Sequence, residues 1–96
     1  MSAPLSVLIV EDAASDAELT VRQLRHAGFD VMHQRIETAE EMATALKKQA
    51  WDVVLSDFRL PNFDAAAALA TLRASGLDIP FIVISGVIEE EVAIEL

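Results

Sequence analysis

Residues 5–12 of the chain, Leu-Ser-Val-Leu-Ile-Val-Glu-Asp, decide the class of fold. The first six form a short apolar run that is rich in β-branched residues. Because side chains on a strand alternate between its two faces, a run that is apolar on both predicts a strand buried in a parallel sheet. The run stops at Glu11 and Asp12, which we therefore expect at the carboxyl end of that strand.

Helix and strand patterns alternate along the rest of the chain. Residues 15–18 and 38–41 both have the Ser/Thr-x-x-Glu form of a capping box and predict helix starts. Asp64 is placed to cap a third helix, and Gly28 and Gly76 are placed to end the first and third. The expected strands are 5–10, 31–37, 53–56 and 81–85, and the expected helices are 15–27, 38–49, 65–74 and one that starts at 89.

This alternation predicts an α/β fold, a doubly wound parallel sheet with helices on both faces. The pattern at 31–37 is weaker and more polar than the others, so we place it at an edge of the sheet. Trp51 precedes the third strand and is expected to be a packing residue. His26 and His33 are expected on the surface, because neither lies at the carboxyl end of a strand.

Length and charge limit the function classes. The 96 residues fit one domain over 1–96, and 53% hydrophobic residues favour a packed core. With 16 acidic and 7 basic residues, the net charge of −9 repels phosphate backbones and anionic lipid, so we expect no direct nucleic-acid partner and no membrane partner.

The absence of Cys excludes disulfides and thiolate zinc sites and favours a cytoplasmic location. No basic residue precedes Arg22, and the apolar stretch 79–88 is interrupted and far short of the ~20 residues of a membrane helix.

The carboxyl ends of the strands are where open parallel sheets place their sites. If the first and third strands are neighbours, the acidic residues at their ends converge in one pocket. The expected strands deliver, in turn, Glu11 and Asp12, Glu37 and Thr38, Asp57, and Ser85 and Gly86.

Three carboxylates in one pocket repel one another, and a hard divalent cation relieves that repulsion. Mg²⁺ takes oxygen ligands and often binds phosphate, and a carboxylate beside it can attack phosphorus to give an aspartyl phosphate. Taken alone, however, the acidic residues are also common in turns. Ser85 alone fits a helix N-cap, and Gly86 alone fits a permissive turn.

Three segments, in this order and spacing, resemble the receiver domain of two-component response regulators, which has the chemotaxis-type flavodoxin-like fold. They are LIVED at 8–12, WDVVLSDFRLPNFD at 51–64 and PFIVISG at 80–86. The resemblance implies parallel strands in the order 2-1-3-4 and a role in phosphorelay signalling. It covers the whole chain.

The resemblance also assigns a metal site and a phosphoacceptor. Asp57 matches the aspartate that attacks a phosphohistidine of a sensor histidine kinase or histidine phosphotransfer protein. Glu11 and Asp12 match the acidic pair that binds Mg²⁺ together with Asp57, and the backbone carbonyl of Arg59 matches a further ligand. A kinase or phosphotransfer protein, and an output domain or effector, are the implied partners.

Three further residues match family positions around the phosphoryl group. Ser85 matches the switch hydroxyl that reorients toward that group. Gly86 matches a position kept small so that the group can enter, and Pro61 matches the proline that shapes the loop after the acceptor.

Two departures from the family pattern stand out. Ala65 occupies a position that is usually Gly. The chain also stops at Leu96, within the expected fourth helix, whereas the family continues to a fifth strand that ends in Lys and a fifth helix. We therefore expect either a fragment of a longer protein or a shortened receiver, with impaired phosphorylation. Because the fourth strand would be left as an open edge, we also expect the chain to self-associate or to be poorly stable.

The leading hypothesis is a Mg²⁺-dependent phosphoacceptor with a regulatory role, not a metabolic enzyme; a longer parent protein could be a hybrid histidine kinase. A phosphorylation-independent interaction module on the same fold is the alternative. A third hypothesis, a Mg²⁺-dependent phosphatase, is disfavoured because residues 11–14 read Glu-Asp-Ala-Ala and lack the expected D-x-D.

Overall fold

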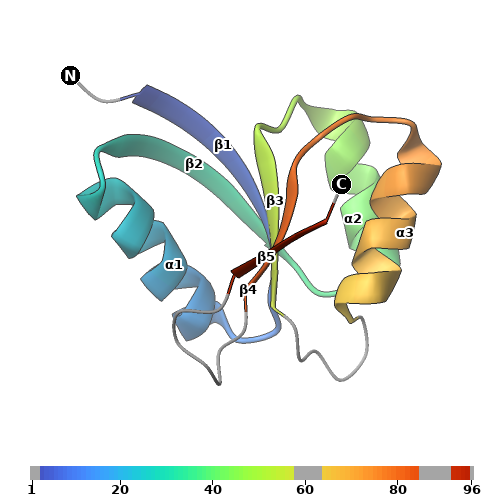
Figure 1. The fold of residues 1–96 in the computed structure, drawn as a ribbon, viewed down its shortest axis with the longest axis horizontal. Coiled ribbons are helices and arrows are strands. Elements are labelled where there is room, and N and C mark those ends of the chain that lie inside the picture. The colour runs from blue at the N-terminus through green and yellow to red at the C-terminus, as the bar shows by residue number, and fades with distance from the viewer. Residues whose placement is uncertain (1–2, 58–63, 85–91, 96) are drawn as a thin grey trace.

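The computed structural model describes residues 3–57, 64–84 and 92–95. These residues form one sheet with helices packed against it (Figure 1). In chain order the elements are β1 (Ala3–Val10), α1 (Ala14–His26), β2 (Phe29–Ile36), α2 (Ala39–Lys48), β3 (Val53–Asp57), α3 (Ala65–Ser75), β4 (Phe81–Ile84) and β5 (Val92–Glu95).

The sheet has the order β2-β1-β3-β4-β5, and its first four strands are mutually parallel. The expected flavodoxin-like order 2-1-3-4 is therefore confirmed, as is the place of β2 at an edge. The strands β1, β3 and β4, which are rich in apolar residues, lie in the interior of the sheet, because strands that are buried on both faces need neighbours on either side.

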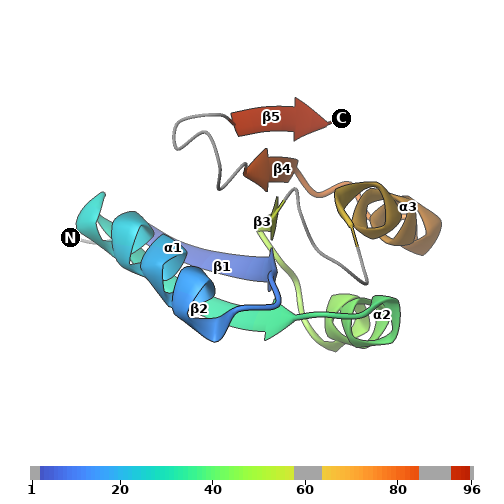
Figure 2. The ribbon, with the colours of Figure 1, turned by 90° about the horizontal axis from the view of Figure 1, so that it is seen from below.

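The C-terminal part of the chain departs from the prediction. Residues 92–95 form β5, which pairs antiparallel with β4 (Figure 2), whereas a fourth helix was expected from residue 89 onward. The backbone groups of β4 would otherwise be unpaired on that side, and Val92 and Ile94 are β-branched residues that favour a strand.

The expectation of an open edge at β4 is therefore wrong, and the self-association expected through that edge loses its structural basis. Every residue of β4 has a partner on β5, from Phe81 opposite Glu95 to Ile84 opposite Val92. The edges of the sheet are β2 and β5.

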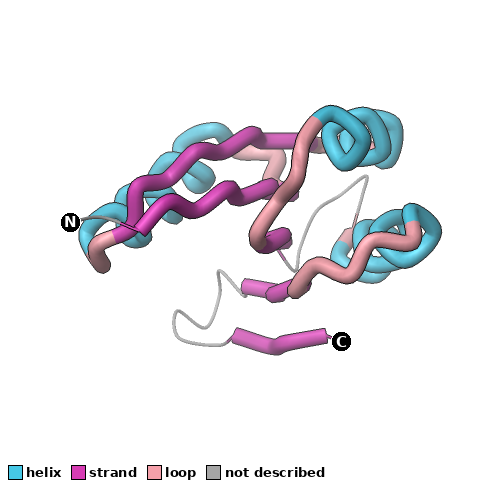
Figure 3. Tube along the Cα trace, turned by 90° about the horizontal axis from the view of Figure 1, so that it is seen from above, coloured by secondary structure: helices cyan, strands magenta, loops and turns pink. Residues whose placement is uncertain are grey.

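Two hydrophobic clusters fill the spaces on either side of the sheet. Alternate residues of β1 divide between them: Leu8 and Val10 face α2 and α3, and Val7 and Ile9 face α1. Figure 3 shows α1 on one side of the strands and the other two helices on the other side. All four β1 residues are at most 3% exposed, so this strand is part of both cores.

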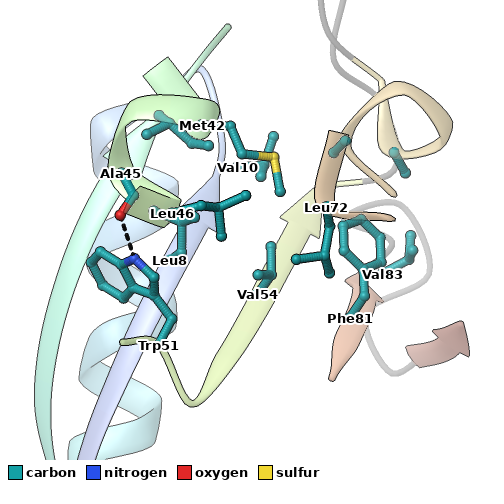
Figure 4. Close-up of a cluster of buried hydrophobic side chains, with 13 residues drawn as sticks. Leu8, Val10, Met42, Ala45, Leu46, Trp51, Val54, Leu72, Phe81 and Val83 are labelled. Carbon is teal, nitrogen blue, oxygen red and sulfur yellow. Dashed lines mark hydrogen bonds between the residues drawn. The ribbon is translucent and has the colours of Figure 1, made fainter. Parts of the chain in front are cut away.

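Trp51 belongs to the cluster on the α2 and α3 side, as expected of a packing residue (Figure 4). Its side chain is 7% exposed, and its indole Nε1 donates a hydrogen bond of 2.8 Å to the carbonyl oxygen of Ala45 in α2. This bond satisfies the polar atom of the ring, so the ring can be buried without an unpaired donor. His26 and His33 are exposed, as expected.

The helix starts confirm two of three predicted caps. Thr38 Oγ1 accepts from the N–H of Glu41, and Asp64 Oδ1 accepts from the N–H of Ala67. The box predicted at Ser15 does not form, because α1 already begins at Ala14 and its N-cap, Ala13, has no side-chain cap. Gly28 and Gly76 follow α1 and α3 with φ of 106° and 78°, as predicted for helix ends.

The helices are short. In the described part of the chain, no helix combines the length and hydropathy that crossing a bilayer requires.

Candidate functional site

The register of the central strands brings the backbone positions of the predicted acidic residues together at the carboxyl ends of those strands. Val10 pairs with Ser56, so the next residues, Glu11 and Asp57, lie at the same level. Asp57 in turn pairs with Ile84, the last described residue of β4. The carboxyl ends of β1, β3 and β4 therefore meet at one edge, which is where open parallel sheets place their sites.

Glu11 is held firmly at this edge. Its backbone N–H donates to the carbonyl oxygen of Ile36 on β2 (3.1 Å), and its carboxylate Oε2 accepts from the backbone N–H of Ala13 (3.1 Å). The residue is only 8% exposed. Burying a carboxylate is unfavourable unless the group is hydrogen-bonded or paired, and the Ala13 N–H supplies such a hydrogen bond here.

Asp12 differs from Glu11 in its surroundings, because it is exposed to solvent. It lies between the end of β1 and the N-cap of α1 at Ala13. The two adjacent acidic residues thus offer one buried and one exposed carboxylate at the same turn of chain.

Four residues named from the sequence lie outside the described residues: Arg59, Pro61, Ser85 and Gly86. Of Asp57, the backbone position at the end of β3 is described. Ser56, directly before it, is fully buried. Ala65, the departure from the family pattern, is the first residue of α3 and is buried.

The carboxyl end of β2 serves a structural purpose. Glu37 forms an ion pair with Arg35 (Nη1 to Oε1, 3.5 Å), and its N–H donates to Oε1 of Glu41 (2.7 Å). Thr38 caps α2. Glu37 and Thr38 also follow the end of a strand, but their contacts join β2 to α2.

Arg35 contacts the loop that carries the acidic pair, and no pattern in the sequence predicted this contact. From the end of β2, its Nη1 donates to the backbone carbonyl oxygens of Glu11 (3.2 Å) and Asp12 (3.3 Å). The partners are 24 and 23 residues away along the chain, so only the pairing of β1 with β2 brings them together.

The donor atoms at this edge suit a hard cation. Glu11 and Asp12 supply carboxylate oxygens, and Mg²⁺ is held in proteins by one or two carboxylates with the remaining positions filled by water or phosphate oxygen. Within residues 3–57, 64–84 and 92–95, no three His, Cys, Asp or Glu side chains form a group that could hold a metal ion.

A parallel sheet in the order 2-1-3-4 with an acidic pair at the end of β1 defines a flavodoxin-like receiver fold. The model of the response regulator receiver domain matches residues 7–96. The chain belongs to this family.

Solved receiver structures resemble this chain closely in fold. The MaeR response regulator bound to beryllium trifluoride superposes with a TM-score of 0.71 at 26% identity, over 90% of this chain and 68% of that one. The receiver domain of the sensor histidine kinase PA1611 from Pseudomonas aeruginosa PAO1, with a magnesium ion coordinated in its active site cleft, gives a TM-score of 0.67 at 26% identity, over 84% and 66%.

Curated relatives include regulators from different kingdoms. The transcription factor SKN7 of Saccharomyces cerevisiae is 34% identical over 80 residues, and the cell cycle transcriptional regulator CtrA of Caulobacter vibrioides is 29% identical over 82 residues. These matches cover 83% and 85% of this chain. The chain spans only 12% of the length of SKN7 and 35% of that of CtrA.

Proposed function

We propose that this chain accepts a phosphoryl group on Asp57 from a sensor histidine kinase or a histidine phosphotransfer protein, and that the transfer switches a signalling surface. The observation that carries the proposal is the strand register: Val10 pairs with Ser56, so the backbone of Asp57 lies beside that of Glu11. Membership of the receiver family supports it. We propose a regulatory role in the cytoplasm, with residues 1–96 acting as one receiver unit.

The proposed transfer is a displacement at phosphorus. A carboxylate oxygen of Asp57 forms a bond to phosphorus while the bond from phosphorus to the donor imidazole nitrogen breaks, and the imidazole keeps that electron pair. Glu11, Asp12, Asp57 and the carbonyl oxygen of Arg59 would hold Mg²⁺. When bound, this ion neutralises negative charge on the phosphoryl oxygens. The magnesium ion in the active site cleft of the PA1611 receiver domain supports a magnesium site in this fold.

Ser85 and Gly86 complete the proposal on the side of β4. Asp57 pairs with Ile84, and Ser85 is the next residue along the chain. We assign the Ser85 hydroxyl the role of contacting the phosphoryl group and Gly86 that of leaving room for it. Output would pass to another domain or effector protein, and relatives such as the transcription factor SKN7 and the hybrid signal transduction histidine kinase B of Dictyostelium discoideum fit such an arrangement.

The decisive experiment replaces the acceptor. Asp57→Asn removes the nucleophilic oxygen, so incubation with acetyl phosphate and Mg²⁺ should leave this variant without the hydroxylamine-sensitive phosphoryl adduct that intact-mass spectrometry detects on the unsubstituted chain. Chelation of Mg²⁺ with EDTA should abolish labelling of the unsubstituted chain in the same assay.

Asp52→Asn is the matched control. Asp52 lies before the other end of β3, where its Oδ2 accepts from the N–H of Ser6 (2.7 Å), and Asn keeps an oxygen acceptor there. This variant should label like the unsubstituted chain. Labelling of Asp57→Asn at the normal level would show that the acceptor is another residue.

One observation favours a second candidate, a phosphorylation-independent interaction module. Ala65, the buried first residue of α3, stands where the family pattern usually has Gly. If the unsubstituted chain takes up no phosphoryl group in the assay above, this second function replaces the first.

A further inference from the structure

The loop that carries the two acidic residues is fixed from β2 as well as from its own strand. The backbone N–H of Glu11 donates to the carbonyl oxygen of Ile36, and the carbonyl oxygen of Glu11 accepts from the side chain of Arg35. Both backbone polar groups of Glu11 are therefore tied to consecutive residues of the neighbouring strand. The carbonyl of Asp12 accepts from the same Nη1 atom.

The geometry of β2 explains how the guanidinium reaches this loop. Arg35 pairs with Ile9 across the β1–β2 ladder, one step before the strands end. Val31, four residues earlier on the same face, packs in the cluster beneath α1, so Arg35 also lies on the α1 side of the sheet. The chain leaves β1 toward α1 on that same side, which brings the carbonyls of residues 11 and 12 within reach.

The charge of Arg35 is balanced locally. Its Nη1 lies 3.5 Å from Oε1 of Glu37, and the two side chains are 33% and 46% exposed. A neighbouring carboxylate offsets the repulsion that an isolated guanidinium would exert on a cation at Glu11 and Asp12. Arg35 can thus orient the loop without opposing the positive charge that the acidic pair would bind.

We propose that Arg35 is a positioning residue for the metal site: its two hydrogen bonds fix the peptide units of Glu11 and Asp12 and thereby set the directions in which their carboxylates leave the backbone. The inference rests on the proposed function, because it needs Mg²⁺ to bind at this pair. Partners that orient metal ligands in this way commonly change metal affinity by about 10–100-fold when they are removed.

The test is a calorimetric titration of the purified chain with MgCl₂. Arg35→Gln removes the charge and the donor that reaches both carbonyls, and it should weaken Mg²⁺ binding by about tenfold, at the lower end of that range. Arg35→Lys keeps a positively charged donor and should restore most of the lost affinity. A purely structural effect would instead lower the melting temperature of the metal-free chain and would not follow this order of variants.

Arg25→Gln is the matched control. Arg25 Nη2 also donates to a backbone carbonyl of β2, that of Val31 (3.3 Å), but this carbonyl lies toward the opposite end of the strand. The same chemical change there should leave Mg²⁺ affinity unchanged. Should Arg35→Gln fail to fold, Arg35→Met, which keeps the apolar stem and removes every donor, carries the same expected loss.

The outcomes separate the two proposals. Tight Mg²⁺ binding by the unsubstituted chain, with equal affinity in Arg35→Gln, would overturn the role of Arg35 and leave the metal site intact. Equal losses in Arg35→Gln and Arg25→Gln would also overturn it. No Mg²⁺ binding by the unsubstituted chain would overturn the metal site itself, and the role of Arg35 with it.

Discussion

The hydroxyl oxygen of Thr38 caps the start of α2, whereas no side chain caps the start of α1. Thr38 Oγ1 accepts from the N–H of Glu41 at 3.1 Å, and Glu41 Oε1 accepts in return from the N–H of Glu37. Ser15 has the same sequence context but lies one residue inside α1. The two positions therefore form a natural comparison for the worth of a cap.

Thr38→Ala should lower the free energy of unfolding by about 1 kcal/mol, because it leaves a helix N–H without its partner. Ser15→Ala should have no such cost, since Ser15 caps nothing and Ala is the better helix former. Urea unfolding followed by circular dichroism measures both. An equal loss in the two variants would show that the Ser15 box forms in solution.

Arg35 shows which site residues a single sequence cannot reveal. Glu11, Asp12 and Asp57 could be named because each follows a recognisable strand and acidic side chains at strand ends are chemically informative. Arg35 has no such local signal, since its partners lie 24 and 23 residues away and depend on the pairing of β1 with β2. The roles of Ser85, Gly86 and Arg59 stay predictions.

At the scale of elements, the sequence predicted the helices and strands that are marked by a strong hydrophobic pattern or by capping residues. β1 to β4 and the three helices fall close to their expected bounds. The prediction of a fourth helix was wrong for residues 92–95 because a short segment can gain hydrogen bonds by pairing with an unpaired strand nearby. Residues 92–95 gain a partner in β4 as a strand, whereas four residues alone give barely one turn of helix.

The pairing of β5 with β4 can be tested by proline substitution. In an edge strand, successive N–H groups alternate between the neighbouring strand and solvent, so one of the adjacent residues Ala93 and Ile94 donates to β4 and the other does not. Ala93→Pro and Ile94→Pro should therefore differ: one removes a ladder hydrogen bond and the other is better tolerated.

Hydrogen exchange of the β4 amides, Phe81 to Ile84, measures the effect. The disruptive variant should speed their exchange and the other should leave it nearer to that of the unsubstituted chain. Exchange that neither substitution alters would contradict the pairing of these two strands.

At the scale of the whole molecule, the charge is strongly unbalanced. The chain carries 16 acidic and 7 basic residues, for a net charge of −9. Mutual repulsion among like charges opposes the compact state, and dissolved salt weakens that repulsion. The same excess of acid that favours a cation at the end of β1 is thus a general cost to stability.

Raising NaCl from low to near-physiological concentration, with EDTA present, should therefore stabilise the chain. If screening contributes about 1 kcal/mol, the melting temperature rises by about 4–8 °C for a domain of this size. Glu18→Lys, at an exposed position on α1, lowers the net charge from −9 to −7 and should reduce the response. A melting temperature that falls with added NaCl would count against charge repulsion as the cause.

The place of Trp51 has a practical consequence for every optical experiment on this chain. It is the one tryptophan of the sequence, and its ring is anchored to Ala45 among side chains on the α2 and α3 side of the sheet. Its emission therefore reports on that half of the protein. Loosening of α1 from the opposite side would pass unseen by fluorescence, and a second probe placed on α1 would be needed to watch both halves separate.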